Sequence, residues 1–297
     1  MQRRRWVVAG ILAGLLVGWL WAGGASAAGL LVSTDELEGL LTNPEVKVVD
    51  ARSPEDYAAG HIPGAVSLFV RKLQYVERGV PEMLVPVEQA ESVLGASGIS
   101  PAHTVIVYDD TIWEPAARVF WTLEVLGHQK VVVLNGGMSK WVKEGRPVSK
   151  DVPTVTPAKY AAKPGWSKYA DAAYLMAKQK DPGIAIVDHR DLRQWSGQVA
   201  SGQVRRAGRI PGGVLVNPEL LIASKDGVKV FKDEPEIAKL YTDAGATKEK
   251  EVISYCRTGM RASVGYLALR TLGYPKIRMY DGSMIEWGNR PELPIEK

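Results

Sequence analysis

A single cysteine, Cys256, is the residue of this chain best suited to covalent chemistry. A short loop follows it, made of Arg257, Thr258, Gly259, Met260 and Arg261. A thiolate is a nucleophile, arginines hold anions through charge-assisted hydrogen bonds, and glycine lets a loop curl tightly. The order of residue types therefore predicts a nucleophilic cysteine in an anion-binding loop.

The residues on either side of Cys256 predict a strand before it and a helix after it. A buried strand is indicated by Val252, Ile253 and Tyr255, and a helix by the spacing of Val264, Leu267, Ala268 and Leu272, with Gly273 placed to end it. Cys256 then lies where the first helical N–H groups lack partners and the helix dipole is positive. We expect this position to lower the pKa of the thiol below that of a free cysteine.

The N-terminal residues have the features of an export signal. Arg3, Arg4 and Arg5 precede an apolar run from Trp6 to Trp21, and Ala25-Ser26-Ala27 supplies small residues for cleavage. We expect residues 1–27 to be a signal peptide that directs the protein to the periplasm. The alternative is an uncleaved N-terminal helix that anchors the protein in the membrane.

Net charge, histidine spacing and cysteine content limit the classes of partner and chemistry that we expect. Loss of the leader lowers the net charge from +4 to +1, because three arginines and no acidic residue leave with it. No basic block remains that favours nucleic acid, so a small molecule or another protein is the expected partner. The four histidines lack ligand-like spacing, and we expect no metal site. A lone cysteine in an exported protein cannot form an internal disulfide, so it is either buried and inert or kept for its reactivity, and its place between strand and helix favours the second.

The chain contains an internal repeat. Residues 43–52 recur as residues 181–190, and the three later matches are residues 61–64 with 209–212, 105–109 with 252–256, and 136–141 with 282–287. Each copy alternates helical segments with valine-rich strands, as in parallel sheets covered by helices. We predict an α/β fold with domains at residues 28–148 and 169–297. The proline-rich residues 149–168 form the expected linker.

The two copies differ at the position that matters for chemistry. Asp109 occupies in the first copy the place of Cys256 in the second, and the residues after Asp109 include neither the glycine nor the arginines. We therefore expect a non-catalytic first domain and a catalytic second one.

With these motifs, the chain resembles the tandem-domain rhodanese family of sulfurtransferases. The residues that carry the likeness are Asp50-Ala51-Arg52, Gly60 to Ala65, Asp188 with Arg190, Arg209 to Gly212, and Cys256 to Arg261. The resemblance implies two rhodanese-like domains, each a parallel sheet flanked by helices. It also implies that the Cys256 thiolate takes the outer sulfur of thiosulfate as a persulfide and releases sulfite. The acceptor would be cyanide, a low-molecular-weight thiol or a dithiol protein, and no cofactor is needed.

The resemblance also assigns roles around the cysteine. The loop amides from Arg257 to Arg261 would cradle the sulfur, Arg257 and Arg261 would meet the sulfonate, and Arg190 would bind the donor. Asp188 would fix the pocket by pairing with an arginine. Many relatives have a further arginine where this chain has Gln194, which leaves only a possible supporting role for the neighbouring Arg193. Residues 198–206 are an insertion at the mouth of the site.

Three alternatives remain from the sequence. Arg257 favours thiosulfate, but 3-mercaptopyruvate and polysulfides are other possible donors. A cysteine phosphatase needs five residues between cysteine and arginine, whereas Cys256 and Arg261 are separated by four. A reading of another class is a sulfur-binding or scaffold protein without turnover.

Overall fold

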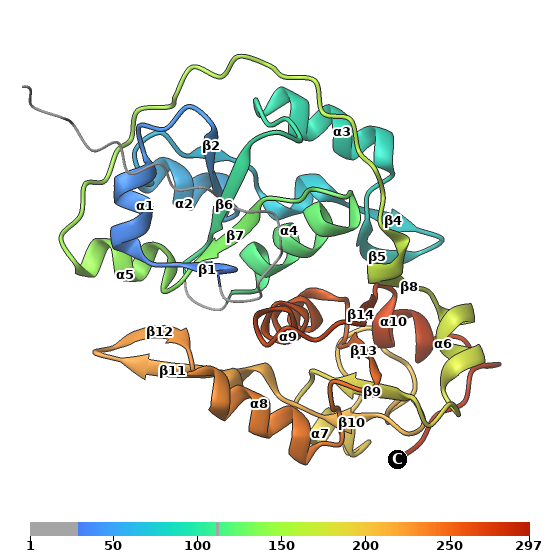
Figure 1. Cartoon of the computed structure of the whole chain (residues 1–297). Coiled ribbons are helices and arrows are strands. Elements are labelled where there is room, and N and C mark those ends of the chain that lie inside the picture. Colours follow the sequence, from blue (N-terminus) through green and yellow to red (C-terminus); the bar gives the residue numbers. More distant parts are fainter. Residues whose placement is uncertain (1–28, 111–112) are drawn as a thin grey trace, which may run out of the picture.

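A computed structural model describes residues 29–110 and 113–297 of the chain. Two halves of similar construction lie side by side in it, each formed around a parallel sheet (Figure 1). The predicted α/β fold with two sheets flanked by helices is confirmed. The signal peptide expected at residues 1–27 lies outside the described residues, and within them no helix is long and apolar enough to span a membrane.

The first half has a five-stranded parallel sheet. Its strand order is β1 (Leu31–Val32), β7 (Val131–Leu134), β6 (Thr104–Tyr108), β2 (Val46–Asp50) and β3 (Val66–Ser67). The helices of this half are α1 (Thr34–Leu40), α2 (Pro54–Ala59), α3 (Val87–Ala96), α4 (Glu114–Val125) and α5 (Gly137–Lys143). Helix α1 begins with the capping box that Ser33 and Glu36 predict.

The second half repeats this arrangement. Its strands run in the order β8 (Tyr169–Ala170), β14 (Ile277–Tyr280), β13 (Glu251–Tyr255), β9 (Ile184–Asp188) and β10 (Val214–Leu215). The helices are α6 (Ala172–Lys178), α7 (Leu192–Trp195), α8 (Glu234–Asp243), α9 (Met260–Thr271) and α10 (Ser283–Trp287). Strand β13 is the centre of its sheet, so it ends with its last residues buried on both faces.

Each half also has a 3₁₀-helix that leads into an antiparallel hairpin. In the first half these are η1 (Val70–Leu73), β4 (Gln74–Glu77) and β5 (Val80–Leu84), and in the second η3 (Pro218–Leu221), β11 (Ile222–Lys225) and β12 (Val228–Phe231). Residues 151–165 cross the outside of the first half without helix or strand and reach η2 (Trp166–Lys168) (Figure 1).

Helices α4 and α9 form the main contact between the halves, and they meet through equivalent residues. Phe120 packs against Tyr266 with ring centroids 6.4 Å apart, and the two residues occupy equivalent positions in the two copies of the repeat. Glu124 and Arg270, also equivalent, pair at 2.8 Å across the interface. Pairs of equivalent residues face each other only near a two-fold axis, so the halves are related by an internal pseudo-two-fold axis that passes between these helices.

A buried ion pair breaks this symmetry. Arg118 in α4 pairs with Asp281 at 2.6 Å, and both side chains are fully buried. Val264 and Asn135 occupy the equivalent positions on the other side of the axis. The backbone contacts are nevertheless alike, because the Leu84 amide donates to Asp281 Oδ2 at 2.7 Å and the Phe231 amide donates to Asn135 Oδ1 at 3.3 Å.

Replacement of Arg118 by valine is expected to lower the free energy of unfolding by about 3–5 kcal/mol, because it leaves Asp281 buried without its counter-charge. The double variant Arg118→Val/Asp281→Asn copies the pair Val264 and Asn135 and should recover part of that loss. Urea unfolding of the three proteins measures both changes. Equal stability of the single and double variants would contradict a role for the Asp281 charge.

Candidate active site

The loop that joins β13 to α9 places Cys256 at the N-terminus of α9. Gly259 caps this helix with φ +85°, a conformation that side chains with a Cβ rarely adopt. A Cβ at this position would also lie 2.5 Å from Arg118 Nη1 of the first half. The glycine predicted to let the loop curl is therefore required by both backbone geometry and packing.

Hydrogen bonds from neighbouring elements fix the loop. The Cys256 amide donates to Ser283 Oγ at 3.2 Å, and the carbonyls of Cys256 and Arg257 accept from Met284 and Ile285 in α10. The Gly259 amide in turn donates to Cys256 Sγ at 3.2 Å. With its carbonyls turned toward α10, the loop directs amide donors at the sulfur, as an anion cradle does.

The expectation of a lowered thiol pKa is wrong for this structure. Cys256 is only 2% exposed, and burial raises the pKa of its thiol above the usual value. The backbone amides of Ala262, Thr258 and Gly259 act in the opposite direction, whereas the nearby carboxylate of Glu114 adds to the rise of the Cys256 pKa. The helix terminus is present as predicted, but the cost of burying a charged sulfur outweighs it.

A cavity of about 310 Å³ opens onto the sulfur. The structure brings to it most of the side chains that the sequence assigns to the site: Cys256, Arg257, Thr258, Met260, Arg261 and Arg190. It also adds three that sequence reasoning did not assign, namely Glu114, Gln194 and Ser201. The three arginines that line this cavity can donate charge-assisted hydrogen bonds to an anionic donor. Among the described residues no cluster of side chains fits a metal ion.

Arg190 is held rigidly at the edge of this cavity. Its guanidinium binds both oxygens of Asp188 and donates to the Gly208 carbonyl at 2.8 Å. The equivalent Arg52 in the first half makes the same contacts with Asp50 and the Gly60 carbonyl. The same carboxylate–guanidinium pair is therefore a structural element of both halves. Only in the second half does it lie at a cavity that a cysteine lines.

Two further expectations concern Arg193 and the insertion at residues 198–206. Arg193 is exposed on α7 and does not line the cavity, whereas the neighbouring Gln194 does. The insertion at residues 198–206 does reach the site, because Ser201 lines the cavity and Gly202 lies against Arg257.

His189 is a core residue rather than a pocket residue. It is fully buried, its ring nitrogens face the Val216 carbonyl and Ser254 Oγ, and burial lowers its pKa to about 4.

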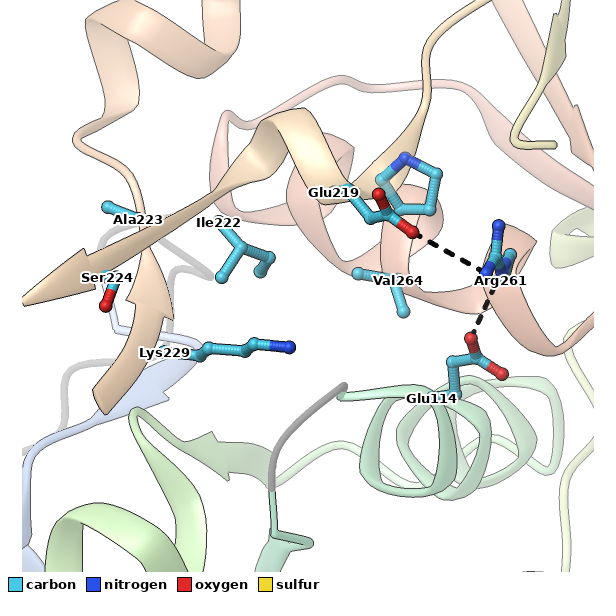
Figure 2. A pocket seen from close by; sticks show the side chains of 9 residues that line it. Glu114, Glu219, Ile222, Ala223, Ser224, Lys229, Arg261 and Val264 are labelled. Carbon is cyan, nitrogen blue, oxygen red and sulfur yellow. Dashed lines mark ion pairs between the residues drawn. The ribbon is translucent and has the colours of Figure 1, made fainter. Parts of the chain in front are cut away.

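Glu114 comes to the site from the first half of the chain. It is the first residue of α4, and Trp113 before it has φ +64° and packs edge-to-face on Phe231 of the second half, with ring centroids 4.6 Å apart. Glu114 Oε1 lies 3.4 Å from Arg261 Nε, and Glu219 Oε1 lies 3.7 Å from Arg261 Nη2 (Figure 2). Burial raises the pKa of Glu114, and Arg261 opposes that rise. A sequence pattern within one half gives no signal for this contact.

Comparison with known families agrees with this site. A model of the rhodanese-like domain matches residues 33–144 and again residues 171–290. The chain belongs to the rhodanese-like family. Its two rhodanese-like domains correspond to the two sheets, and the cavity around Cys256 lies in the second.

Curated relatives cover nearly the whole chain. A protein named thiosulfate sulfurtransferase from Azotobacter vinelandii is 34% identical over 267 residues, which are 90% of this rhodanese and 97% of the relative. One of the same name from Pseudomonas aeruginosa is 32% identical over the same shares. A relative from Thermus thermophilus, 34% identical and 96% covered, is named sulfur carrier protein TtuD.

Solved structures of similar fold include an anaerobic ergothioneine biosynthesis enzyme from Chlorobium limicola with bound trimethyl histidine. The TM-score is 0.81 at 26% identity, over 90% of this rhodanese and 70% of that chain. The wild-type structure of EanB gives a TM-score of 0.81 at 25% identity.

Alkylation of Cys256 by iodoacetamide is expected to have a pH midpoint above that of a free cysteine, because burial raises the thiol pKa and only the thiolate reacts. Glu114→Gln removes a charge that raises this pKa and should move the midpoint to lower pH. Glu219→Gln is the matched control, since Glu219 also pairs with Arg261 but does not line the sulfur cavity. A wild-type midpoint at or below that of free cysteine would contradict the effect of burial.

Proposed function

We propose that this rhodanese transfers the outer sulfur of thiosulfate to a thiophilic acceptor through a persulfide on Cys256. The observation that carries the proposal is the position of its one cysteine. The sulfur accepts a backbone N–H in a cavity that Arg257, Arg261 and Arg190 also line. The names of the curated relatives support sulfur transfer in general.

The first step needs a nucleophile and a site for an anion. The Cys256 thiolate forms a bond to the outer sulfur of thiosulfate, the sulfur–sulfur bond of the donor breaks, and sulfite leaves with the electron pair. Sulfite is a weak base, so its departure needs no general acid. Arg257 and Arg261 hold the sulfonate oxygens while the amides near Sγ favour the anionic sulfur.

The raised pKa of the thiol affects this first step. Because burial keeps much of the Cys256 sulfur protonated near neutral pH, the fraction of thiolate limits the attack on the donor. The thiolate fraction of free Cys256 does not limit the second step, because the acceptor takes the outer sulfur of the persulfide. Cyanide, a small thiol or a dithiol protein then takes this atom and leaves the Cys256 thiolate.

The charge of the cavity supports thiosulfate over other donors. Arg190 and Arg261 pair with carboxylates, whereas Arg257 has no ion pair among the described residues, and a compact dianion gains more from this charge than 3-mercaptopyruvate does. EanB has a similar fold and its structures hold ergothioneine or hercynine, so the fold alone does not determine which small molecules take part in the transfer.

Incubation with thiosulfate is expected to release one sulfite per chain and to add one sulfur atom to the intact mass of the protein. Cys256→Ser should abolish both while leaving the fold unchanged by circular dichroism, because no other residue supplies a thiol. A wild-type protein that binds thiosulfate but never gains sulfur would instead indicate a sulfur-binding or scaffold protein. Sulfite release by the serine variant would show that the nucleophile is misassigned.

We also propose that the protein is exported with removal of residues 1–27. The supporting features are the three arginines, the apolar run and the small residues before Ala28. Expression in a bacterial host should give a periplasmic protein that begins at Ala28, as read by N-terminal sequencing. A membrane fraction that retains Met1 would instead support the anchored alternative.

A further inference from the structure

A second cavity adjoins the sulfur cavity. It has a volume of about 350 Å³ and shares two lining residues, Glu114 and Arg261, with the cavity that holds Cys256. The remaining lining side chains come from η3, the hairpin of β11 and β12, and α9: Pro218, Glu219, Ile222, Ala223, Ser224, Lys229 and Val264. Figure 2 shows the ion pairs of Arg261 with Glu114 and Glu219 in this second cavity.

The internal symmetry gives the wall of this cavity a different counterpart in the first half. Arg118 is the equivalent of Val264, and its guanidinium is buried against Asp281 on the other side of the pseudo-two-fold axis. Val264 is a shorter, apolar side chain, and it borders the second cavity. The two halves therefore differ at this position, with a buried ion pair in one and a cavity wall in the other.

The chemistry of the walls differs from that of the sulfur cavity. Pro218, Ile222 and Val264 supply an apolar surface, which a small dianion such as thiosulfate cannot use. Lys229 extends into the cavity from the hairpin, opposite the ion pairs of Arg261 (Figure 2). Among the described residues no carboxylate pairs with Lys229. Glu219 and Glu114 are already engaged by Arg261.

We propose that this second cavity binds the sulfur acceptor, a small thiol with an aliphatic body and an anionic group at its far end. The body packs on Ile222 and Val264, the anionic group binds Lys229, and the thiol lies at the boundary beside Arg261. The inference rests on the proposed function, because it assigns a site to the second step of the same transfer.

The transfer in this arrangement balances without an oxidant or a reductant. The acceptor thiol loses its proton to solvent, and its sulfur forms a bond to the outer sulfur of the Cys256 persulfide. The bond between that outer sulfur and Sγ breaks, and Sγ leaves with the electron pair as the thiolate. The product is a hydropersulfide of the acceptor, and the enzyme is ready for another donor.

The experiment compares three acceptors with the persulfide form of the protein. Mercaptohexanoate has the body and the anionic end, mercaptohexanol has only the body, and cyanide has neither. Lys229→Gln is expected to lower kcat/KM for mercaptohexanoate about ten-fold, the effect of one charge-assisted hydrogen bond at a half-open site. It should leave mercaptohexanol and cyanide unchanged, and Lys229→Arg should restore most of the loss.

Matched controls separate this site from general charge effects. Lys225→Gln removes a lysine from the same hairpin outside the cavity, where it pairs loosely with Asp233, and should change none of the three acceptors. Ile222→Ser should weaken mercaptohexanoate and mercaptohexanol alike while sparing cyanide. An unchanged Lys229→Gln variant, or an equal loss with all three acceptors, overturns the proposal.

Binding of hexanoate, which has no thiol, distinguishes failure of this inference from failure of the proposed function. Calorimetric titration should show binding to the wild-type protein and at least a five-fold weaker binding, about 1 kcal/mol, to Lys229→Gln. Hexanoate binding without any persulfide formation would support the anion-binding site at Lys229 and contradict sulfur transfer. Persulfide formation with equal hexanoate affinity in the two proteins would keep sulfur transfer and reject the acceptor site.

Discussion

The packing of α4 against α9 is the contact on which the site depends. It brings equivalent residues of the two halves together, as Phe120 with Tyr266 and Glu124 with Arg270 show. The same contact places Glu114 in the sulfur cavity and Arg118 against Gly259. A half without catalytic residues is therefore part of the active site, because it shapes the loop and supplies one wall. Loss of this interface would expose the cysteine loop as well as two apolar helix faces.

Burial of the thiol sets the electrostatic problem that the second half must solve. A helix N-terminus and three amides favour an anion at Cys256, yet the low-dielectric surroundings and Glu114 raise the thiol pKa. Arg261 partly neutralises Glu114 and stands beside both cavities. The pKa of the thiol is therefore raised mainly by burial and further by a carboxylate from the other half, and that carboxylate pairs with Arg261.

Much of the fold could be predicted from the sequence, because repeats and hydrophobic spacing are local signals. The strand and helix around Cys256, the role of Gly273 and the duplication all follow from residues close in sequence, and the structure confirms them. Glu114 could not be found in this way, since it contacts the site only through the packing of two separate domains. The thiol pKa was predicted with the wrong sign because a helix terminus can be read from sequence, whereas the depth of burial depends on the whole fold. Which of two adjacent residues of α7 lines the cavity also depends on the fold, and the structure places Gln194 there and leaves Arg193 exposed.

The asymmetry between the halves links the repeat to function. Asp109 takes the place of Cys256, Trp113 has the left-handed conformation that Gly259 has in the second half, and Arg118 with Asp281 replaces Val264 with Asn135. The first difference removes the nucleophile, and the second keeps a left-handed residue before the helix without a glycine. The third places a buried ion pair where the second half has a valine that borders the second cavity. A buried ion pair is seldom more stable than apolar packing, so stability alone does not explain why the pair occurs on one side. Its consequence is that Arg118 lies against Gly259, whereas Val264 at the equivalent position borders a second cavity that shares Glu114 and Arg261 with the sulfur cavity.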